Sequence, residues 1–272
     1  NGCVGVKLYP PMGFAPLGNS DLHGPNGRSY WAREWLPGWT SRADLGERLD
    51  EAMMKLLSWC EAKKVPVMAH TAQSNGVTPD FEMLAGSPYW KKALEFCPDL
   101  RVSFGHFGDS SVVKDGIGFA RKFAALMRAN PGEPGAFAYA DSGYFVEVIN
   151  SRPELLENLQ KLYDETADKG RAALANRFMY GTDWEMTLNE GYVGNYLEAF
   201  EKLLNEFEAR PALQAAGLTG LRQKFFAENA VDWIGLRKGD AARDRLDAFY
   251  SANGVPTPDW MTKVDILEQP VG

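Results

Sequence analysis

Residues 65–70 read VPVMAH, residues 101–106 read RVSFGH and residues 178–183 read FMYGTD. Each is a short apolar run without polar alternation, which is the pattern of a strand buried on both faces of a parallel sheet. Residues 4–8 and 136–141 have the same character. The sequence therefore predicts five parallel strands. Three of them, 65–70, 101–106 and 178–183, end on His70, His106 and Asp183.

Segments with helical periodicity separate the predicted strands. Between the first two, apolar residues recur at three- and four-residue steps from Leu45 to Cys60. Further helical patterns cover residues 88–96, 117–127, 193–208 and 218–236, and another begins near residue 153. Strands that alternate with helices give a parallel sheet or barrel with the helices outside, because such crossovers are right-handed. The predicted fold class is α/β, in one domain over residues 1–239.

The composition is that of an ordinary soluble globular protein. Of the 272 residues, 45 % are hydrophobic and 24 % charged, and no apolar run approaches the ~20 residues that span a bilayer. The net charge of −7 argues against nucleic acid and membranes as partners, because both attract basic surfaces. Cys3, Cys60 and Cys97 are odd in number and widely spaced, which favours reduced thiols and a cytoplasmic location.

His70, His106 and Asp183 close three of the predicted strands, and the chain has only three histidines in all. In a parallel barrel the C-terminal strand ends face one pocket, so these side chains are expected to converge. Two imidazoles and a carboxylate suit a divalent metal, with zinc first and manganese or iron as alternatives. The other interpretation is three unrelated strand-end residues packed under loops.

The same residues are the predicted catalytic groups. A divalent ion lowers the pKa of bound water from ~15.7 toward 7, and Asp183 would take up the proton as general base. His106 would donate a proton or stabilise an oxyanion. Lys7 could hold an anionic substrate, or pack in the barrel and pair with a carboxylate. Trp184 could line the pocket or pack on the final helix. Asp141 could support a ligating imidazole or cap the next turn.

Two segments depart from the strand–helix pattern. Residues 9–40 carry five prolines, five glycines and six aromatic residues, and a loop of this length is usually functional or disordered. We expect it to lie over the pocket as a lid or substrate wall, or to serve as an oligomer contact or structural cap. Residues 240–272 are rich in proline and charge, which predicts a surface tail of irregular structure or an oligomer contact.

Several motifs together resemble the amidohydrolase superfamily, and most closely its branch of aminocarboxymuconate-semialdehyde and resorcylate decarboxylases. They are GVKLYPPMGF at 5–14, VMAHTAQSNG at 67–76, VSFGHFGDS at 102–110, MYGTDW at 179–184 and FFAENAVDWIGL at 225–236. The resemblance implies a TIM (β/α)8 barrel in which residues 4–8 form strand four. It makes His70 the strand-five metal ligand, His106 the strand-six histidine and Asp183 the strand-eight aspartate.

The resemblance implies a metal-dependent hydrolase of an amide, ester or lactone bond in a small molecule. A decarboxylase of an aromatic or unsaturated carboxylic acid is the alternative on the same site, and a metal-free binding or structural relative is the third possibility. The family's HxH pair on strand one has no counterpart in this sequence, and five of eight strands are predicted. We therefore expect the C-terminal part of a longer protein, completed by an upstream segment or by a partner subunit in a homo-oligomer. A less favoured explanation is a relative that has lost the pair.

Overall fold

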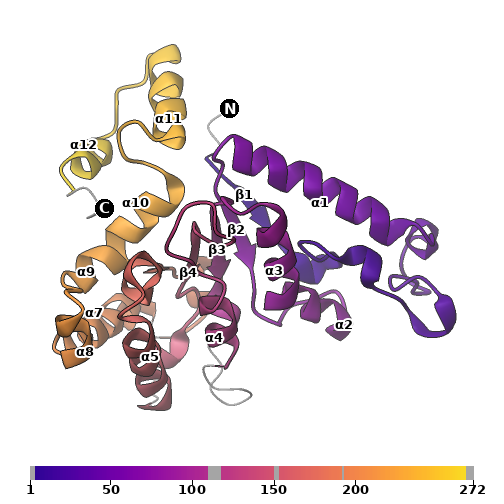
Figure 1. Cartoon of the computed structure of the whole chain (residues 1–272), viewed down its shortest axis with the longest axis horizontal. Helices are drawn as coiled ribbons and strands as arrows, with labels where there is room; N and C mark the ends of the chain where they lie inside the picture. The colour runs from indigo at the N-terminus through magenta and orange to yellow at the C-terminus, as the bar shows by residue number, and fades with distance from the viewer. Residues whose placement is uncertain (1–3, 110–117, 150–152, 192, 268–272) are drawn as a thin grey trace.

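The computed structural model describes residues 4–109, 118–149, 153–191 and 193–267. Its described strands form one five-stranded sheet in the order β1-β2-β3-β4-β5, with every neighbouring pair parallel (Figure 1). Their bounds are β1 Val6–Leu8, β2 Val67–His70, β3 Val102–Gly105, β4 Ala138–Asp141 and β5 Phe178–Met179. The predicted five parallel strands are confirmed. Closure into an eight-stranded barrel stays a prediction.

Helices are present where the periodicity predicts them, with bounds that shift by a few residues, and the structure adds short helices at 79–82, 184–187 and 211–215 that were not predicted. The helices between strands are α1 Leu45–Ala62, α2 Pro79–Glu82, α3 Ser87–Phe96, α4 Gly118–Ala124 and α5 Pro153–Thr166. After β5 come α6 Trp184–Thr187, α7 Tyr196–Glu208, α8 Pro211–Ala215, α9 Leu221–Gln223 and α10 Asn229–Ile234, with a π-helical turn, Lys224–Glu228, joining the last two. None of the helices described is long and apolar enough to cross a membrane.

The two faces of the sheet have different coverings. Phe104 and Phe178 belong to the main core, which the sheet shares with the surrounding helices. On the opposite face, Tyr139 and Met179 pack against Trp233 of α10. Successive residues of a strand point to opposite faces. One residue therefore faces the main core, and the next faces the side of the sheet on which α10 packs. The main core thus fixes which side chains face the candidate site.

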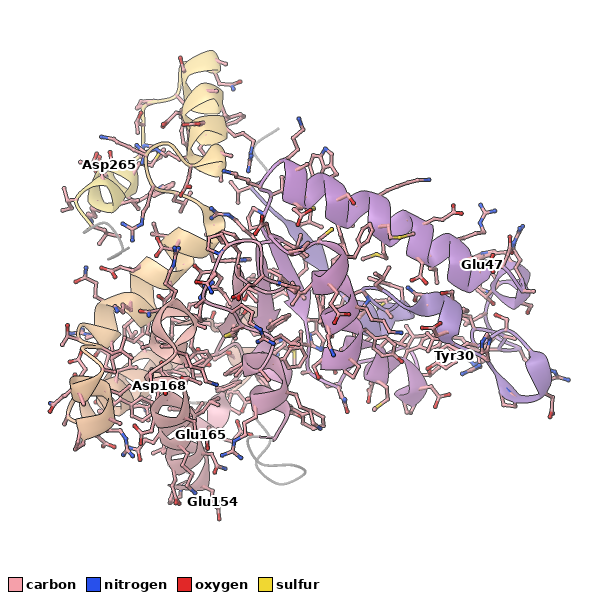
Figure 2. The ribbon with its side chains drawn as sticks, viewed as in Figure 1. Tyr30, Glu47, Glu154, Glu165, Asp168 and Asp265 are labelled. Atoms are coloured by element: carbon pink, nitrogen blue, oxygen red, sulfur yellow. The ribbon has the colours of Figure 1, made fainter. Side chains whose placement is uncertain are left out.

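The structure after Asp240 corrects the expectation of an irregular tail. Two helices, α11 Ala241–Ala252 and α12 Asp259–Asp265, stand at one end of the molecule (Figures 1 and 2). Leu246 and Met261 pack with Val231 of α10 in a small hydrophobic cluster. The buried Arg243 pairs with Asp247 and Asp265. These helices could not be recognised from the sequence because few of their positions are buried and apolar, so that prolines and charged residues dominate the pattern.

Residues 9–40 are ordered and contain four 3-10 turns, Pro10–Met12, Asn19–Asp21, Pro25–Gly27 and Gly38–Ser41. Trp31 packs with Leu45 of α1 and Phe81 of α2 in a separate hydrophobic cluster. The Tyr30 hydroxyl donates to the Asp80 carbonyl at 2.8 Å, and Figure 2 shows Tyr30 toward the same end of the molecule as Glu47 of α1. Most of this segment therefore has its own core beside α1 and α2, and its role as a lid stays a prediction.

One buried carboxylate ties this segment to α1. Asp50 is 8 % exposed, and its Oδ1 accepts hydrogen bonds from Gly18 N, Asn19 N and Asn19 Nδ2, each at 2.9 Å. Its Oδ2 accepts from the backbone N–H and the hydroxyl of Ser20. Burial acts to raise the pKa of Asp50, but the donors of Ser20 and Asn19 outweigh it, so the pKa is lowered overall.

Asp50→Ala is expected to lower the free energy of unfolding by about 2–4 kcal/mol, because buried backbone donors would lose their acceptor. The pKa of Asp50 is lower in the folded chain than its ordinary value. Its contribution is therefore complete above the ordinary aspartate range and is lost as the pH falls through the lowered value. Urea unfolding from neutral pH down to about pH 3 should show wild type and variant converging.

Asp44→Ala, at the residue directly before α1, is the matched control. Asp44 pairs with Arg42 at 2.8 Å, and both side chains are exposed, so its loss should leave the unfolding midpoint unchanged. Equal destabilisation by the two alanine variants would contradict the assignment of Asp50 as the anchor of residues 9–40.

Candidate active site at the strand ends

Strained backbone is concentrated after β3, β4 and β5. Seven described residues other than glycine have positive φ, and four of them lie here: His106 at 64°, Phe107 at 46°, Tyr144 at 57° and Asp183 at 49°. The other three are Asn26, Lys64 and Asn75. Positive φ is uncommon outside glycine, and for a bulky residue such as Phe107 it is an outlier. Strain of this kind persists only where the surroundings impose it, and it gathers at functional sites. The strand ends are therefore the first place to look for function.

Two imidazoles meet at these strand ends. The His70 and His106 ring centroids are 4.6 Å apart at an interplanar angle of 67°, and Tyr9 stacks on the other side of His70 at 4.2 Å. His70 is 4 % exposed. Burial, followed by the nearby His106 and Lys7, lowers the pKa of His70 to about 3. His70 is thus neutral at physiological pH, which is the form of histidine that binds metals.

The Nε2 atom of His70 is buried and, among the described residues, has no hydrogen-bond partner. A buried polar atom without a partner is costly and calls for a ligand, an ion or a water molecule. The position of His70 at the end of β2, from which the sequence prediction was made, puts its ring beside the second imidazole.

Hydrogen bonds fix the second imidazole. His106 Nδ1 lies 2.9 Å from the Gly143 carbonyl oxygen. A carbonyl can only accept, so Nδ1 carries the proton, and in neutral imidazole Nε2 then keeps its lone pair. The backbone N–H of His106 donates to Asp141 Oδ1 at 3.1 Å. Asp141 also accepts from Gly143 N and from Ser103 Oγ, both at 3.0 Å. It therefore caps the turn after β4 and supports His106 at once.

Asp183, Lys7 and Trp184 are the other predicted site residues. Asp183 precedes α6 and is exposed, and its carbonyl accepts from the backbone N–H groups of Met186 and Thr187. The pKa of Lys7 is lowered by burial, which the charges of Asp141 and Asp183 partly offset. Trp184 is 64 % exposed, so it does not pack into the core.

Tyr9 is the residue that the sequence analysis missed. It stacks on His70. The pKa of Tyr9 is raised overall, because burial and the charge of Asp183 outweigh the opposite effect of a hydrogen bond with Asn75. Tyr9 directly follows β1, so the strand-end rule that selected the other residues could have found it. Tyr9 thus contacts His70 and is near enough to Asp183 for that charge to act on its pKa.

The comparisons with known proteins identify the family. The sequence model of the amidohydrolase family matches residues 1–236, which includes every strand and every residue of the cluster. The chain belongs to the amidohydrolase family. Searches of curated proteins and of solved structures found no match. Family membership confirms the resemblance seen in the motifs, and the five-stranded parallel sheet is consistent with the barrel of this family.

Amidohydrolases generally use a divalent metal, so the donor set has to be tested against one. The neutral His70, with its buried and unpartnered Nε2, and His106, with its free lone pair, fit a borderline ion such as Zn²⁺ as a pair of ligands. In the described part of the chain, no three His, Cys, Asp or Glu side chains are grouped closely enough to hold a metal ion. The structure therefore brings two predicted ligands together, and Asp183 as the third stays a prediction.

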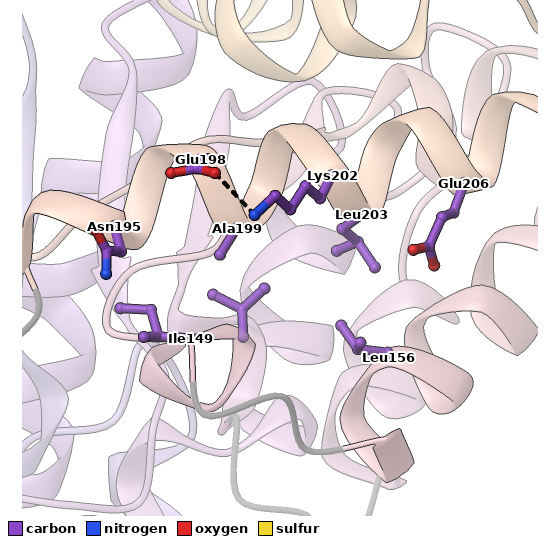
Figure 3. Close-up of a pocket in the computed structure, with 9 residues that line it drawn as sticks. Ile149, Leu156, Asn195, Glu198, Ala199, Lys202, Leu203 and Glu206 are labelled. Carbon is purple, nitrogen blue, oxygen red and sulfur yellow. Dashed lines mark ion pairs between the residues drawn. The ribbon is translucent and has the colours of Figure 1, made fainter.

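A surface hollow elsewhere on this amidohydrolase is separate from the cluster. It measures about 280 Å³ and lies between α5, the turn Val146–Val148 and α7 (Figure 3). It is lined by Val148, Ile149, Leu156, Asn195, Glu198, Ala199, Lys202, Leu203 and Glu206. Glu198 and Lys202 pair with each other at 2.7 Å. None of the strand-end groups lines this hollow.

Proposed function

We propose that this amidohydrolase is a metal-dependent hydrolase that cleaves an amide, ester or lactone bond in a small molecule at the C-terminal ends of its strands. The observation that carries the proposal is the buried, unpartnered Nε2 of His70, with the His106 ring centroid 4.6 Å from that of His70. A neutral imidazole whose buried Nε2 has no partner among the described residues is poised to bind an ion.

His70, His106 and Asp183 would hold the divalent ion, with zinc the first expectation. When bound, such an ion activates water and polarises a carbonyl group. The chain's own part is to orient and to move protons. The hydrogen bond to Gly143 holds His106 with Nε2 turned away from that carbonyl. Asp183 is exposed and can take a proton from the nucleophile and pass it to the leaving group.

Lys7 and Trp184 are the proposed substrate contacts. Burial lowers the pKa of Lys7, and the nearby charges of Asp141 and Asp183 offset part of that effect. The ammonium of Lys7 would pair with an anionic group on the substrate. The indole of Trp184, next to Asp183, offers an exposed apolar surface for the rest of the molecule. A decarboxylase of an aromatic or unsaturated acid is the second candidate, because Lys7 could equally hold the carboxylate that is lost.

The test is to purify the full chain, measure its metal content by mass spectrometry and assay it on aryl esters, amides, lactones and aromatic carboxylic acids. We expect bound divalent metal and hydrolytic turnover that a chelator abolishes. Release of CO₂ from the acids without any hydrolysis would replace the proposal by the decarboxylase. Protein that holds no metal and turns over nothing after zinc is supplied would favour the metal-free relative.

A further inference from the structure

Asp141 has an unusual environment for a residue that only caps a turn. It is 6 % exposed, at the end of β4. Its Oδ1 accepts from the backbone N–H groups of His106 at 3.1 Å and Gly143 at 3.0 Å, and its Oδ2 accepts from Ser103 Oγ at 3.0 Å. Burying a carboxylate is costly unless it is hydrogen-bonded, and these three donors come from β3 and from the turns after β3 and β4.

These hydrogen bonds close a ring around the second imidazole. Asp141 Oδ1 holds the N–H of His106, the imidazole Nδ1 of His106 donates to the Gly143 carbonyl, and the N–H of Gly143 returns to the same Oδ1. One carboxylate oxygen therefore holds both the backbone of His106 and the backbone of Gly143, whose carbonyl accepts the hydrogen bond from the imidazole. The φ of 64° at His106 shows that this turn is held in a conformation it does not prefer.

Two glycines make the close approach of this carboxylate possible. A Cβ atom at Gly143 would lie 3.0 Å from Asp141 Oδ1 and 3.2 Å from His106 Nδ1. A Cβ atom at Gly181 would lie 3.1 Å from the same Oδ1. Neither glycine has a positive φ, so the missing side chain rather than the backbone conformation matters at both positions. A side chain at either glycine would therefore crowd Asp141, and one at Gly143 would also crowd the imidazole of His106.

We propose that Asp141 is a positioning residue, which keeps His106 in the Nδ1-protonated tautomer and turns its Nε2 lone pair toward the site. Asp141 acts through His106 and does not itself touch the substrate. The inference rests on the proposed function for its catalytic consequence, but the tautomer of His106 can be measured whether or not that function is correct. A carboxylate that only capped the turn would affect stability and leave the tautomer alone.

The experiment compares Asp141→Ala with Asp141→Asn in the full chain. An asparagine can keep its Oδ1 on the two backbone N–H groups and donate its amide to Ser103 Oγ, which can accept as well as donate. Two-bond ¹H–¹⁵N spectra of ¹⁵N-histidine-labelled protein report the tautomer, and only three histidines need assignment. The spectra are recorded as purified and after chelation, because a bound ion would itself impose the Nδ1-protonated form.

After chelation we expect wild type and Asp141→Asn to show the Nδ1-protonated form at His106, and Asp141→Ala to show a mixture with the Nε2-protonated form. The alanine variant should lose about 10- to 100-fold in kcat with KM within about twofold, the usual effect of losing the support of a ligating histidine. An unchanged tautomer in Asp141→Ala would overturn the proposal. If wild type itself turns over no substrate while the tautomer shifts as expected, the proposed function fails and the positioning role stands.

Gly143→Ala keeps the proposal testable if Asp141→Ala does not fold. The added methyl would crowd Asp141 Oδ1 and His106 Nδ1 and break the ring without removing the carboxylate. We expect the same mixture of His106 tautomers. Gly191→Ala is the control, because a Cβ there meets no atom within 4 Å. A Gly143→Ala spectrum identical to that of Gly191→Ala would count against the proposal.

Discussion

Asp183→Asn is expected to lower kcat by about 10²–10⁴-fold, which is the usual contribution of a general base, while the fold stays intact. An amide keeps the shape of the carboxylate and can still accept a hydrogen bond, but it cannot take up a proton at neutral pH. The fold should tolerate the change because the carbonyl of Asp183, rather than its side chain, accepts the first hydrogen bonds of α6. Asparagine also tolerates the left-handed φ of 49° found there.

Glu185→Gln provides the matched control for this variant. Glu185 is an exposed carboxylate two residues further along the same turn, and the same chemical change there should leave kcat as it is in wild type. The measurements are steady-state rates on whichever of the assayed esters, amides, lactones or acids proves to be a substrate, and thermal unfolding of wild type and both variants. A near-native rate in Asp183→Asn, or equal losses in both variants, would remove Asp183 as the general base.

The strands were predictable because burial on both faces leaves a continuous apolar signal. The expected fifth strand, residues 178–183, is nevertheless shorter in the structure and ends at Met179. The reason is tertiary: Tyr180 donates its N–H to the Phe225 carbonyl of the π-helical turn, so the chain leaves the sheet there. No local pattern announces that partner, which is 45 residues away in sequence.

The candidate site was predictable to a similar degree and for a similar reason. Strand ends can be located from sequence, so His70 and His106 were found together with their neighbourhood. The stacking of Tyr9 on His70 and the ring through Asp141 depend on side-chain directions and turn geometry, which periodicity does not encode. For Asp141 the sequence left two roles open. The structure shows the cap of the turn after β4, whereas the acceptor of the imidazole N–H is the Gly143 carbonyl, and Asp141 reaches His106 through its backbone N–H.

The second large effect is expected at His70. His70→Ala should lower the affinity for zinc by at least about 100-fold, more than the loss of a supporting residue costs, because it removes a donor atom itself. In wild type the ion would take up the lone pair of Nε2, which is buried and has no partner in the described chain. Binding to the folded state alone stabilises it by ~2.7 kcal/mol when free zinc is 100 times Kd. Zinc should therefore raise the thermal midpoint of chelated wild type and leave that of His70→Ala unchanged.

His23→Ala separates the loss of a ligand from the loss of any histidine. His23 is exposed in the segment 9–40 and pairs only by its backbone with Ser29 in an isolated bridge, so its variant should bind zinc and respond to it as wild type does. Metal content after dialysis and the thermal midpoint with and without zinc are read for all three proteins. The two readouts do not depend on knowing the substrate. If His70→Ala retained zinc and its stabilising effect, the ion would have to be held by other groups, and the assignment of the imidazole pair as the metal site would be wrong.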